Sequence, residues 1–349
     1  MKKWLMMMVA AVLMVGLLAG CGARSQQSGS STNGGEAGGK QASGEKITIK
    51  FSHVVAENTP KGQAAEMFKK LAEEYTNGKV EVQVFPNSQL YTDEDVLAAI
   101  QQNNVQLAAP STSVITKLYP QWTLFDLPFI FKDEANVQAA MESPEIGGKL
   151  FTMLEDQNLL GLAMWDNGFK QMHSNKAIKT PADFKGQKLR VMSSKVLEAQ
   201  FKSVGANPTP MAFGEVYSAL EQGVIDGGEN TLSNIYSQKM HEVQKSITMS
   251  NHGYLGYAVI TNADFWNGLP DDVRQSLEKA LDETTEWVRE NSKRVNDEQL
   301  EDIKAAGKTE IITLTDEEKQ AWVDAMTSIY PQFEDQIGKD LIDAAKALW

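Results

Sequence analysis

Cysteine is almost absent from this sequence: Cys21 is the single cysteine among 349 residues. The rest of the chain therefore has no residue for a disulfide, a thiolate metal site or a thiol nucleophile. Histidine is scarce too, and no two of the four histidines stand at the close spacing of a metal-binding motif. A Gly-x-Ser-x-Gly hydrolase elbow and a complete phosphate-binding loop are also missing. These absences predict a protein that is not an enzyme and that carries no metal or other cofactor.

Positive charge is also in short supply. Lysine and arginine together number 33, aspartate and glutamate number 46, and the formal net charge is −13. Such an excess of acid disfavours nucleic acid and anionic membrane surfaces as partners. An anionic ligand would have to be held by a local basic site that works against the overall field.

Long apolar runs are missing except near the N-terminus. Lys2 and Lys3 precede an apolar stretch over residues 5–19, which is shorter than the roughly 20 residues of a spanning helix. The stretch ends in Leu-Ala-Gly-Cys at Cys21, which resembles a bacterial lipobox. We therefore expect a signal peptide at residues 1–20 and acylation of Cys21. The resulting lipoprotein would be anchored to the cell membrane and would face the exterior or the periplasm.

The segment after Cys21 is rich in Gly, Ser, Gln and Asn. Such a composition cannot bury a core, so residues 21–45 are predicted to be a flexible linker behind the lipid anchor. The remaining residues, 46–349, are numerous enough to form two lobes.

Strand and helix patterns alternate along this folded part. Residues 46–53 and 79–85 alternate apolar and polar side chains, which is typical of strands. Thr59 and Pro60 between them indicate the start of a helix that runs to about Tyr75. The same alternation continues with the following elements: helices at 93–103, 195–204, 214–223, 271 to about 306, 315–329 and 332–348, and strands at 105–109, 159–165, 187–192, 246–250, 254–261 and 311–314.

This alternation predicts an α/β protein with a two-lobed, periplasmic-binding-protein-like fold of the type II kind. We expect lobe I to comprise residues 46–166 and about 256–295, and lobe II to comprise 167–255 and about 296–349. A ligand would lie in the cleft between the lobes, with the long helix from Asp271 spanning both, and hinge closure would bury the ligand.

Five stretches together resemble the solute-binding proteins of TRAP transporters, and most closely their dicarboxylate-binding, DctP-type branch. The similarity covers residues 46–349. The stretches are Phe51–Gly62, Phe85–Tyr91, Phe125–Phe131, Trp165–Met172, and a discontinuous fifth made of Gly186–Val191, Pro210–Tyr217 and Gly223–Asn230.

The resemblance implies roles for two residues. In this family an arginine in the strand after a Gly-x-Lys turn forms a bidentate salt bridge with the ligand carboxylate, and Arg190 has that position. The planar guanidinium suits a carboxylate. An asparagine at the position of Asn230 hydrogen-bonds the same carboxylate, and the two glycines before Glu229 allow close approach of the backbone.

Two lysines extend the predicted site. Lys170 stands where many relatives carry a second arginine, and it would either bind a second carboxylate or pair with an acid at the lobe boundary. Lys61 lies in a first helical turn, where amides and a cation suit an anion. Three cations with Arg190 favour a small dianion over a monocarboxylate.

The remaining candidates are polar or aromatic residues expected around the cleft. Ser111 and Ser113 would donate to a carboxylate or cap a helix, and Phe213 would form an apolar wall or pack in the core. The other ligand-binding candidates are Gln89, His252 and Tyr254.

The resemblance implies a monomeric receptor that captures a C4-dicarboxylate (malate, succinate or fumarate) and delivers it to the membrane permease subunits of the transporter. The main alternative is the same fold with another organic acid, such as a uronate or a monocarboxylate. Two further alternatives are a receptor that presents its ligand to a membrane kinase and an extracellular hydrolase.

Overall fold

The computed structural model of the protein describes residues 46–349. The predicted signal peptide at 1–20, the linker at 21–45 and the acylation site at Cys21 lie outside the described residues. Within residues 46–349, no helix is long and apolar enough to cross a membrane.

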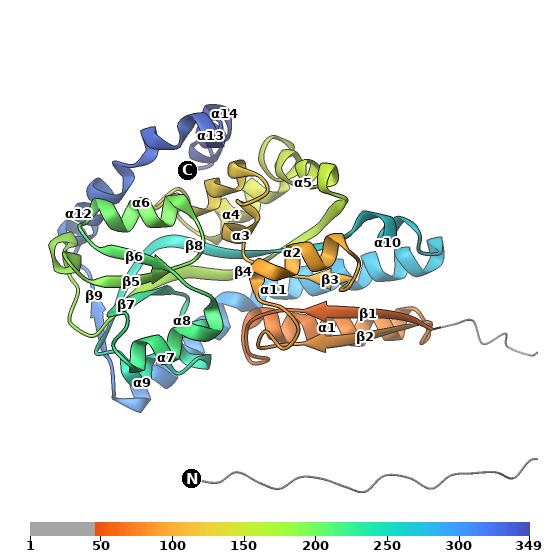
Figure 1. The fold of residues 1–349 in the computed structure, drawn as a ribbon, viewed down its shortest axis with the longest axis horizontal. Coiled ribbons are helices and arrows are strands. Elements are labelled where there is room, and N and C mark those ends of the chain that lie inside the picture. The colour runs from red at the N-terminus through yellow and green to blue at the C-terminus, as the bar shows by residue number, and fades with distance from the viewer. Residues whose placement is uncertain (1–45) are drawn as a thin grey trace, which may run out of the picture. The chain divides into compact units, whose positions relative to one another are not determined.

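Nine strands form one mixed sheet (Figure 1). Their bounds are β1 Ile47–Ser52, β2 Val80–Phe85, β3 Leu107–Ala108, β4 Leu159–Ser174, β5 Lys188–Val191, β6 Asn207–Pro210, β7 Gly227–Asn230, β8 Ser246–Asn262 and β9 Glu310–Thr313.

Helices connect and cover these strands. The α-helices are α1 Pro60–Tyr75, α2 Asp93–Gln101, α3 Thr112–Ile115, α4 Glu134–Glu142, α5 Lys149–Met153, α6 Lys195–Ser203, α7 Val216–Glu221, α8 Leu232–Ser237, α9 Met240–Val243, α10 Ala263–Asn267, α11 Asp271–Ala306, α12 Asp316–Thr327, α13 Glu334–Ile337 and α14 Lys339–Lys346. Short 3-10 or π turns are η1 Pro120–Asp126, η2 Pro144–Gly148, η3 Leu154–Gln157, η4 Pro181–Phe184, η5 Phe213–Glu215 and η6 Tyr330–Gln332.

The sheet has a parallel set at each end. Its strand order is β2-β1-β3-β8-β4-β7-β5-β6, and β9 pairs with β8. The first set, β2-β1-β3, is parallel throughout, as is the second set, β6-β5-β7. The antiparallel strands β8 and β4 join the two sets (Figure 1). Strands of each set therefore point their carboxyl ends toward the middle of the molecule, where α/β sheets bind ligands.

The two joining strands are unusually long, at 16 residues for β4 and 17 for β8. Their pairing shifts register three times, between Gly161 and Ala163, between Asp166 and Gly168, and near Lys170. Such bulges bend a sheet and re-aim its side chains. The sequence predicts only the first half of β4 and divides β8 into two strands, because a bulge interrupts the regular alternation of apolar residues.

Local sequence signals account for the best-predicted helices. Thr59 caps α1 by accepting a hydrogen bond from the N–H of Gly62, and Pro60 stands at its first position, as the sequence predicts. The 36-residue helix α11 starts at Asp271 and ends at Ala306. Gly307 follows it with a φ of 63°, in the left-handed region that favours glycine. Helix α11 packs against α1 beside the first set and against α8 beside the second set.

Four clusters of buried apolar side chains stabilise the two ends of the molecule. The C-terminal residues from Ile329 to Ala345 pack in one cluster with side chains from Val96 to Met164. Trp322 and Met326 pack instead with Leu189 and its neighbours in the second set. The C-terminal segment therefore contacts both ends of the molecule. The packing of its last part favours including it with the residues predicted for lobe I, and the exact lobe boundaries stay a prediction.

Candidate functional site

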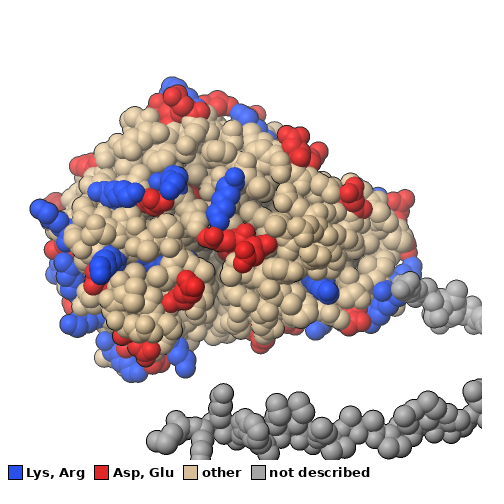
Figure 2. Space-filling view, in the orientation of Figure 1, with Lys and Arg blue, Asp and Glu red and all other residues tan. Residues whose placement is uncertain are grey.

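One pocket lies where the strands of both parallel sets have their carboxyl ends. It contains about 550 Å³ of space not filled by atoms, part of it open to solvent. The face in Figure 2 is hollowed near its centre, beside acidic side chains at the start of α2. This central pocket is lined by Val54, Val55, Ser88, Thr92, Asp93, Glu94, Ser111, Val114, Arg190, Met192, Ser193, Met211, Ala212, Phe213, Asn230, Asn234, Leu255 and Tyr257.

Arg190 is the only cationic residue in that lining. It belongs to β5, is 5 % exposed, and its Nε donates to the carbonyl of Met211 at 3.0 Å. Among residues 46–349 no carboxylate forms a salt bridge with it, so the two terminal nitrogens keep their donors for a ligand. Burial lowers the pKa of Arg190 to about 10, against the opposing charge of Glu229, so the guanidinium stays charged at neutral pH. A fixed planar fork of this kind suits a carboxylate.

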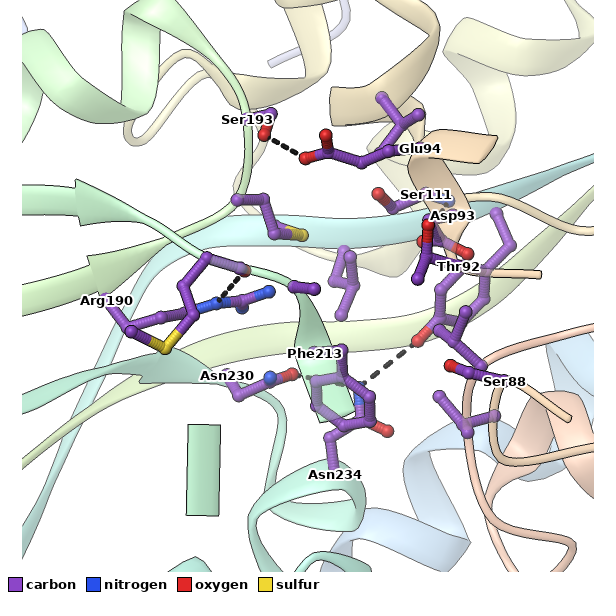
Figure 3. Close-up of a pocket in the computed structure, with 18 residues that line it drawn as sticks. Ser88, Thr92, Asp93, Glu94, Ser111, Arg190, Ser193, Phe213, Asn230 and Asn234 are labelled. Atoms are coloured by element: carbon purple, nitrogen blue, oxygen red, sulfur yellow. Dashed lines mark hydrogen bonds between the residues drawn. The ribbon is translucent and has the colours of Figure 1, made fainter. Parts of the chain in front are cut away.

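Asn230 ends β7 near Arg190 (Figure 3). Its Oδ1 accepts from the N–H of Thr231 at 3.0 Å and from Nδ2 of Asn234 at 2.9 Å. With the oxygen doubly occupied, the Nδ2 donors of Asn230 are left for a ligand. The arrangement thus presents amide and guanidinium donors to the same space.

The glycines before Glu229 allow β7 to fit between its neighbours. A Cβ on Gly227 would lie 2.2 Å from the carbonyl oxygen of His173 in β4. A Cβ on Gly228 would lie 3.1 Å from the carbonyl oxygen of Arg190 in β5. The close approach that the sequence predicts here is therefore an approach between strands, and it places Asn230 and Arg190 on adjacent strands.

The walls of the pocket combine aromatic and hydroxyl groups. The Phe213 ring lies 6.0 Å from Cζ of Arg190 and forms an apolar side of the pocket. Ser111 bridges to Tyr257 of β8 in an antiparallel pairing, and both residues are in the lining. The Tyr257 hydroxyl accepts from Nδ2 of Asn234 at 3.2 Å, and burial raises its pKa, so its proton remains available to donate.

A hydrogen bond crosses the rim of the pocket. Glu94, on α2 beside the first set, accepts from the hydroxyl of Ser193 in the loop after β5 (Figure 3). Its other carboxylate oxygen accepts from Nζ of Lys117 at 2.8 Å. The Lys117 and Ser193 hydrogen bonds lower the pKa of Glu94. Glu94 therefore connects the two sides of the pocket at its mouth.

Lys170 and His252 lie behind the pocket and not in its lining. Nζ of Lys170 donates to Glu229 Oε1 at 2.6 Å, and His252 Nε2 lies 2.6 Å from Glu229 Oε2. Gln200 donates to the same oxygen at 3.2 Å. We call these four residues the Glu229 cluster. Lys170 thus has an acidic partner, which is one of the two roles considered for it from the sequence, and a direct ligand contact by Lys170 or His252 stays a prediction.

The charges within the Glu229 cluster compensate one another. Burial raises the pKa of the Glu229 carboxyl, but Lys170 and His252 together outweigh that effect and hold the pKa at about 2. Burial lowers the pKa of His252, and Glu229 opposes this shift. A Cβ on Gly253 would lie 2.8 Å from Cε of Lys170, so this glycine leaves room for the lysine side chain.

Lys61 is fully buried one layer behind the pocket wall. Its Nζ donates to the carbonyl of Ala109 at 2.9 Å and lies 3.5 Å from the centre of the Tyr257 ring. Burial lowers the pKa of Lys61 to about 8, while the charge of Asp93 opposes the shift. Lys61 therefore acts on the pocket through its field and through Tyr257, and ligand contact by its own ammonium group stays a prediction.

Three other predicted residues lie outside the pocket lining. Ser113 donates to Asp126 Oδ1 at 2.5 Å, and the Tyr254 hydroxyl donates to Asp166. Gln89 is exposed, and its predecessor Ser88 lines the pocket instead. Roles in ligand binding for Ser113, Tyr254 and Gln89 stay predictions.

The comparisons with known proteins match almost the whole described part. The model of the bacterial extracellular solute-binding proteins, family 7 (DctP), matches residues 51–336. The chain belongs to this family. It is 51 % identical over 304 residues to the C4-dicarboxylate-binding periplasmic protein DctP of Rhodobacter capsulatus, a match that covers 87 % of this chain and 91 % of that protein.

Solved structures of similar proteins agree with the fold. A TRAP periplasmic solute-binding protein of Shewanella oneidensis with bound succinate superposes with a TM-score of 0.85 at 45 % identity, covering 87 % of this chain and 99 % of that one. A TRAP periplasmic solute-binding protein of Pseudomonas aeruginosa with bound L-malate superposes with a TM-score of 0.80 at 40 % identity. The match covers 82 % of this chain and 99 % of that one. The predicted periplasmic-binding-protein fold and the DctP-type family are thereby confirmed.

Family membership makes this chain an extracytoplasmic solute-binding protein and not an enzyme. Within residues 46–349, no group of three or more His, Cys, Asp or Glu side chains is arranged to hold a metal ion. The chemistry available in the central pocket of this solute-binding protein is reversible binding by hydrogen bonds and charge.

Sequence reasoning missed several lining residues of the solute-binding protein. Asp93 and Glu94 are missed because the sequence shows them only as the start of the helix predicted at 93–103, and α2 does begin at Asp93. Tyr257 is missed although Tyr254, three residues away, is a candidate. The alternation of residues along β8 does not predict which side chains face the pocket, because the bulged pairing with β4 changes the register.

Proposed function

We propose that this protein is the extracytoplasmic receptor of a TRAP importer and that it captures a C4-dicarboxylate such as succinate, fumarate or malate. The observation that carries the proposal is the convergence of Arg190 and Asn230 in the central pocket, each with donors that no described residue occupies. Together they would hold one carboxylate. The C4-dicarboxylate-binding protein of Rhodobacter capsulatus and the bound succinate and L-malate in the two similar structures support the C4 class.

The second carboxylate would be held mainly by neutral donors. Ser111 and Tyr257 offer hydroxyl groups in the lining, and Lys61 supplies positive charge from behind the Tyr257 ring. The sequence predicts three cations for the site, but neither Lys61 nor Lys170 is in the pocket lining, and ligand contact by either stays a prediction. A ligand with one carboxylate, such as a uronate, is the second candidate, because Arg190 is the only cation in the lining.

The proposed receptor would deliver its ligand to the membrane permease subunits of the importer. The predicted acylation of Cys21 would keep it near that partner. The family membership supports an importer role, and the lipobox-like segment supports the anchor. Labelling of cells with a radioactive fatty acid, compared between the parent chain and Cys21→Ser, tests the anchor.

Calorimetric titration tests the ligand assignment. The purified protein is stripped of carried-over ligand by unfolding and refolding, and then titrated with malate, succinate, fumarate, glucuronate, lactate and glutamate. We expect one-to-one binding of the C4 diacids. Arg190→Ala removes the guanidinium fork and should weaken this binding by about 2 to 5 kcal/mol, which is roughly 30-fold or more.

Arg294→Ala provides the matched control, because Arg294 is an exposed arginine of α11 whose hydrogen bonds within residues 46–349 go only to Asn291 and Glu298. Its binding constants should equal those of the parent. Equal binding by Arg190→Ala and the parent would refute the site. If glucuronate or lactate bound and no C4 diacid did, the proposed ligand class would be wrong and the receptor role would stand.

A further inference from the structure

The lining of the central pocket includes two acids, although an anion receptor would be expected to avoid them. Glu94 pairs with Lys117, whereas Asp93 forms no salt bridge among residues 46–349. Asp93, the first residue of α2, and Ser111, at the start of α3, lie together across the pocket from Arg190 (Figure 3). Any dicarboxylate held by Arg190 brings its second carboxylate toward this side. Like charges in a confined site repel one another, so Asp93 needs a compensating role.

The hydrogen bonds of Asp93 and Ser111 determine which of their donor and acceptor atoms remain free for a ligand. Asp93 Oδ2 accepts from the backbone N–H of Ser111 at 3.2 Å, which orients the carboxylate. Its Oδ1 has no hydrogen bond to any residue in 46–349. The Ser111 hydroxyl belongs to a residue that is 2 % exposed, and it too lacks a partner within the described part of the chain. A free acceptor and an unsatisfied hydroxyl therefore stand side by side.

Ser111 and Asp93 together suit a ligand that carries a hydroxyl group on the carbon next to a carboxylate. The Ser111 O–H would donate to a carboxylate oxygen of the ligand, and Asp93 Oδ1 would accept from a ligand O–H on the adjacent carbon. The repulsion by Asp93 acts on every C4 diacid alike, but only a hydroxylated one gains a charge-assisted hydrogen bond in return. Succinate and fumarate would leave the Asp93 oxygen unpaired.

Stabilisation of the start of α2 by negative charge is the competing explanation for Asp93. Glu94 and Asp95 in the same turn already supply that charge. A helix-start role also requires no unpaired oxygen in the pocket, and it gives no reason for ligand discrimination. The two explanations therefore differ in what they predict for ligands with and without a hydroxyl group.

We propose that Asp93, paired with Ser111, selects C4-dicarboxylates that carry a hydroxyl group beside the distal carboxylate, so that malate is preferred to succinate. The proposal rests on the proposed function, since it assumes that Arg190 and Asn230 hold the first carboxylate. A single oriented acceptor also distinguishes the two enantiomers of malate, because only one of them directs its hydroxyl toward Asp93.

Titration of the stripped protein with L-malate, D-malate and succinate tests this selectivity. One malate enantiomer should bind about tenfold or more tighter than succinate, as a hydrogen bond to a charged group allows. In Asp93→Asn the Ser111 N–H keeps the amide oxygen, which directs the amide NH₂ into the pocket. Succinate should then bind several-fold tighter than it binds to the parent. The ratio of the malate association constant to the succinate association constant should fall to about one or below.

Asp95→Asn is the matched control, because it removes the same charge from the same helical turn and Asp95 does not line the pocket. It should keep the parental ratio. Asp93→Ser serves the same purpose as Asp93→Asn if the asparagine variant does not fold. A parental ratio in a folded Asp93 variant, or equal binding of malate and succinate by the parent, would overturn the proposal.

Failure of the proposed function gives a different pattern. In that case the parent binds none of the three acids, whatever residue stands at position 93. Binding of succinate and malate with equal affinity, both abolished by Arg190→Ala, would instead retain the proposed function and refute the role of Asp93.

Discussion

Two buried cations, Arg190 and Lys170, lie on neighbouring parts of one sheet and have opposite surroundings. Lys170 is fully enclosed and pairs with Glu229, which His252 and Gln200 also contact. Arg190 is 5 % exposed, and its nearest fixed partner is a backbone carbonyl. The first cation is neutralised by the chain itself, and the second is left for a ligand.

The difference shows that burial of a cation does not identify a ligand contact. What distinguishes Arg190 is the lack of a carboxylate at salt-bridge distance among the described residues, together with a place in the pocket lining. A buried pair such as Lys170 and Glu229 adds little net stability compared with apolar residues, but it becomes costly when one member is removed.

The largest expected effect comes from breaking the Glu229 cluster. Glu229→Gln leaves the Lys170 ammonium buried without an anion, and we expect it to reduce the free energy of unfolding by about 3 to 5 kcal/mol. Adding Lys170→Met should restore most of that loss, because the unpaired charge is gone. Denaturant unfolding at pH 7 measures both.

Glu198→Gln is the control for this prediction. Glu198 pairs with Lys195 and Lys202 near the surface, so its loss should cost no more than about 1 kcal/mol. The contrast between the two cations would be contradicted if Glu229→Gln lost no more unfolding free energy than Glu198→Gln. It would also be contradicted if the losses from Glu229→Gln and Lys170→Met simply added in the double variant.

Acid pH should weaken the Glu229 cluster in a second, smaller effect. The pKa of Glu229 is about 2 in the folded protein, below the value of 4.5 for a free glutamate. Its contribution to stability is therefore fully present above about pH 4.5 and is lost as the pH falls through about 2. Denaturant unfolding at pH 6, 4.5, 3.5 and 2.5 should show a decline that is flatter in Glu229→Gln.

Arg190→Met should retain the steep acid decline, because it leaves the Glu229 cluster intact. An equally steep decline in Glu229→Gln would mean that other carboxylates dominate the acid sensitivity. The buried His53 and His173 also contribute, because burial lowers their pKa values to about 3 and about 4. Their share of the stability is present above about pH 6.5 and is lost as the pH falls through those values.

The smallest expected effect concerns the stability of the ligand-free pocket. Arg190→Met removes a buried charge that no carboxylate of the described chain neutralises, so the free energy of unfolding without ligand should change by less than about 1 kcal/mol or rise. Stabilisation by saturating succinate should disappear in the same variant. A loss of several kcal/mol without ligand would show that Arg190 is structural, as Glu229 is.

Local signals made much of the fold predictable. The cap at Thr59, Pro60 and the apolar spacing along Asp271–Ala306 depend on neighbours within a few residues, and the helices begin and end as expected. Gly338, with a φ of 98°, divides the last predicted helix into α13 and α14. That break is also local, and a glycine within a helical pattern is its signal.

The pocket was less predictable because its contacts are distant in sequence. Lys170 and Glu229 are 59 residues apart, and their pairing follows from the register of β4 with β7. Arg190 and Asn230 were inferred through family resemblance, while Asp93 and Tyr257 enter the pocket only through the arrangement of α2 and the bulged β8. No periodicity in the sequence reveals such a meeting of strands.

The path of β8 also has a consequence for the order in which the chain can fold. Strand β3 at Leu107 and Ala108 pairs with β8 at Thr261 and Ile260, so the first parallel set borders a strand made more than 150 residues later. A ribosome that has released only the first 200 residues has produced an unfinished sheet with an open edge. The first set therefore cannot complete its sheet before β8 has been made, and such long-range pairing makes folding slow.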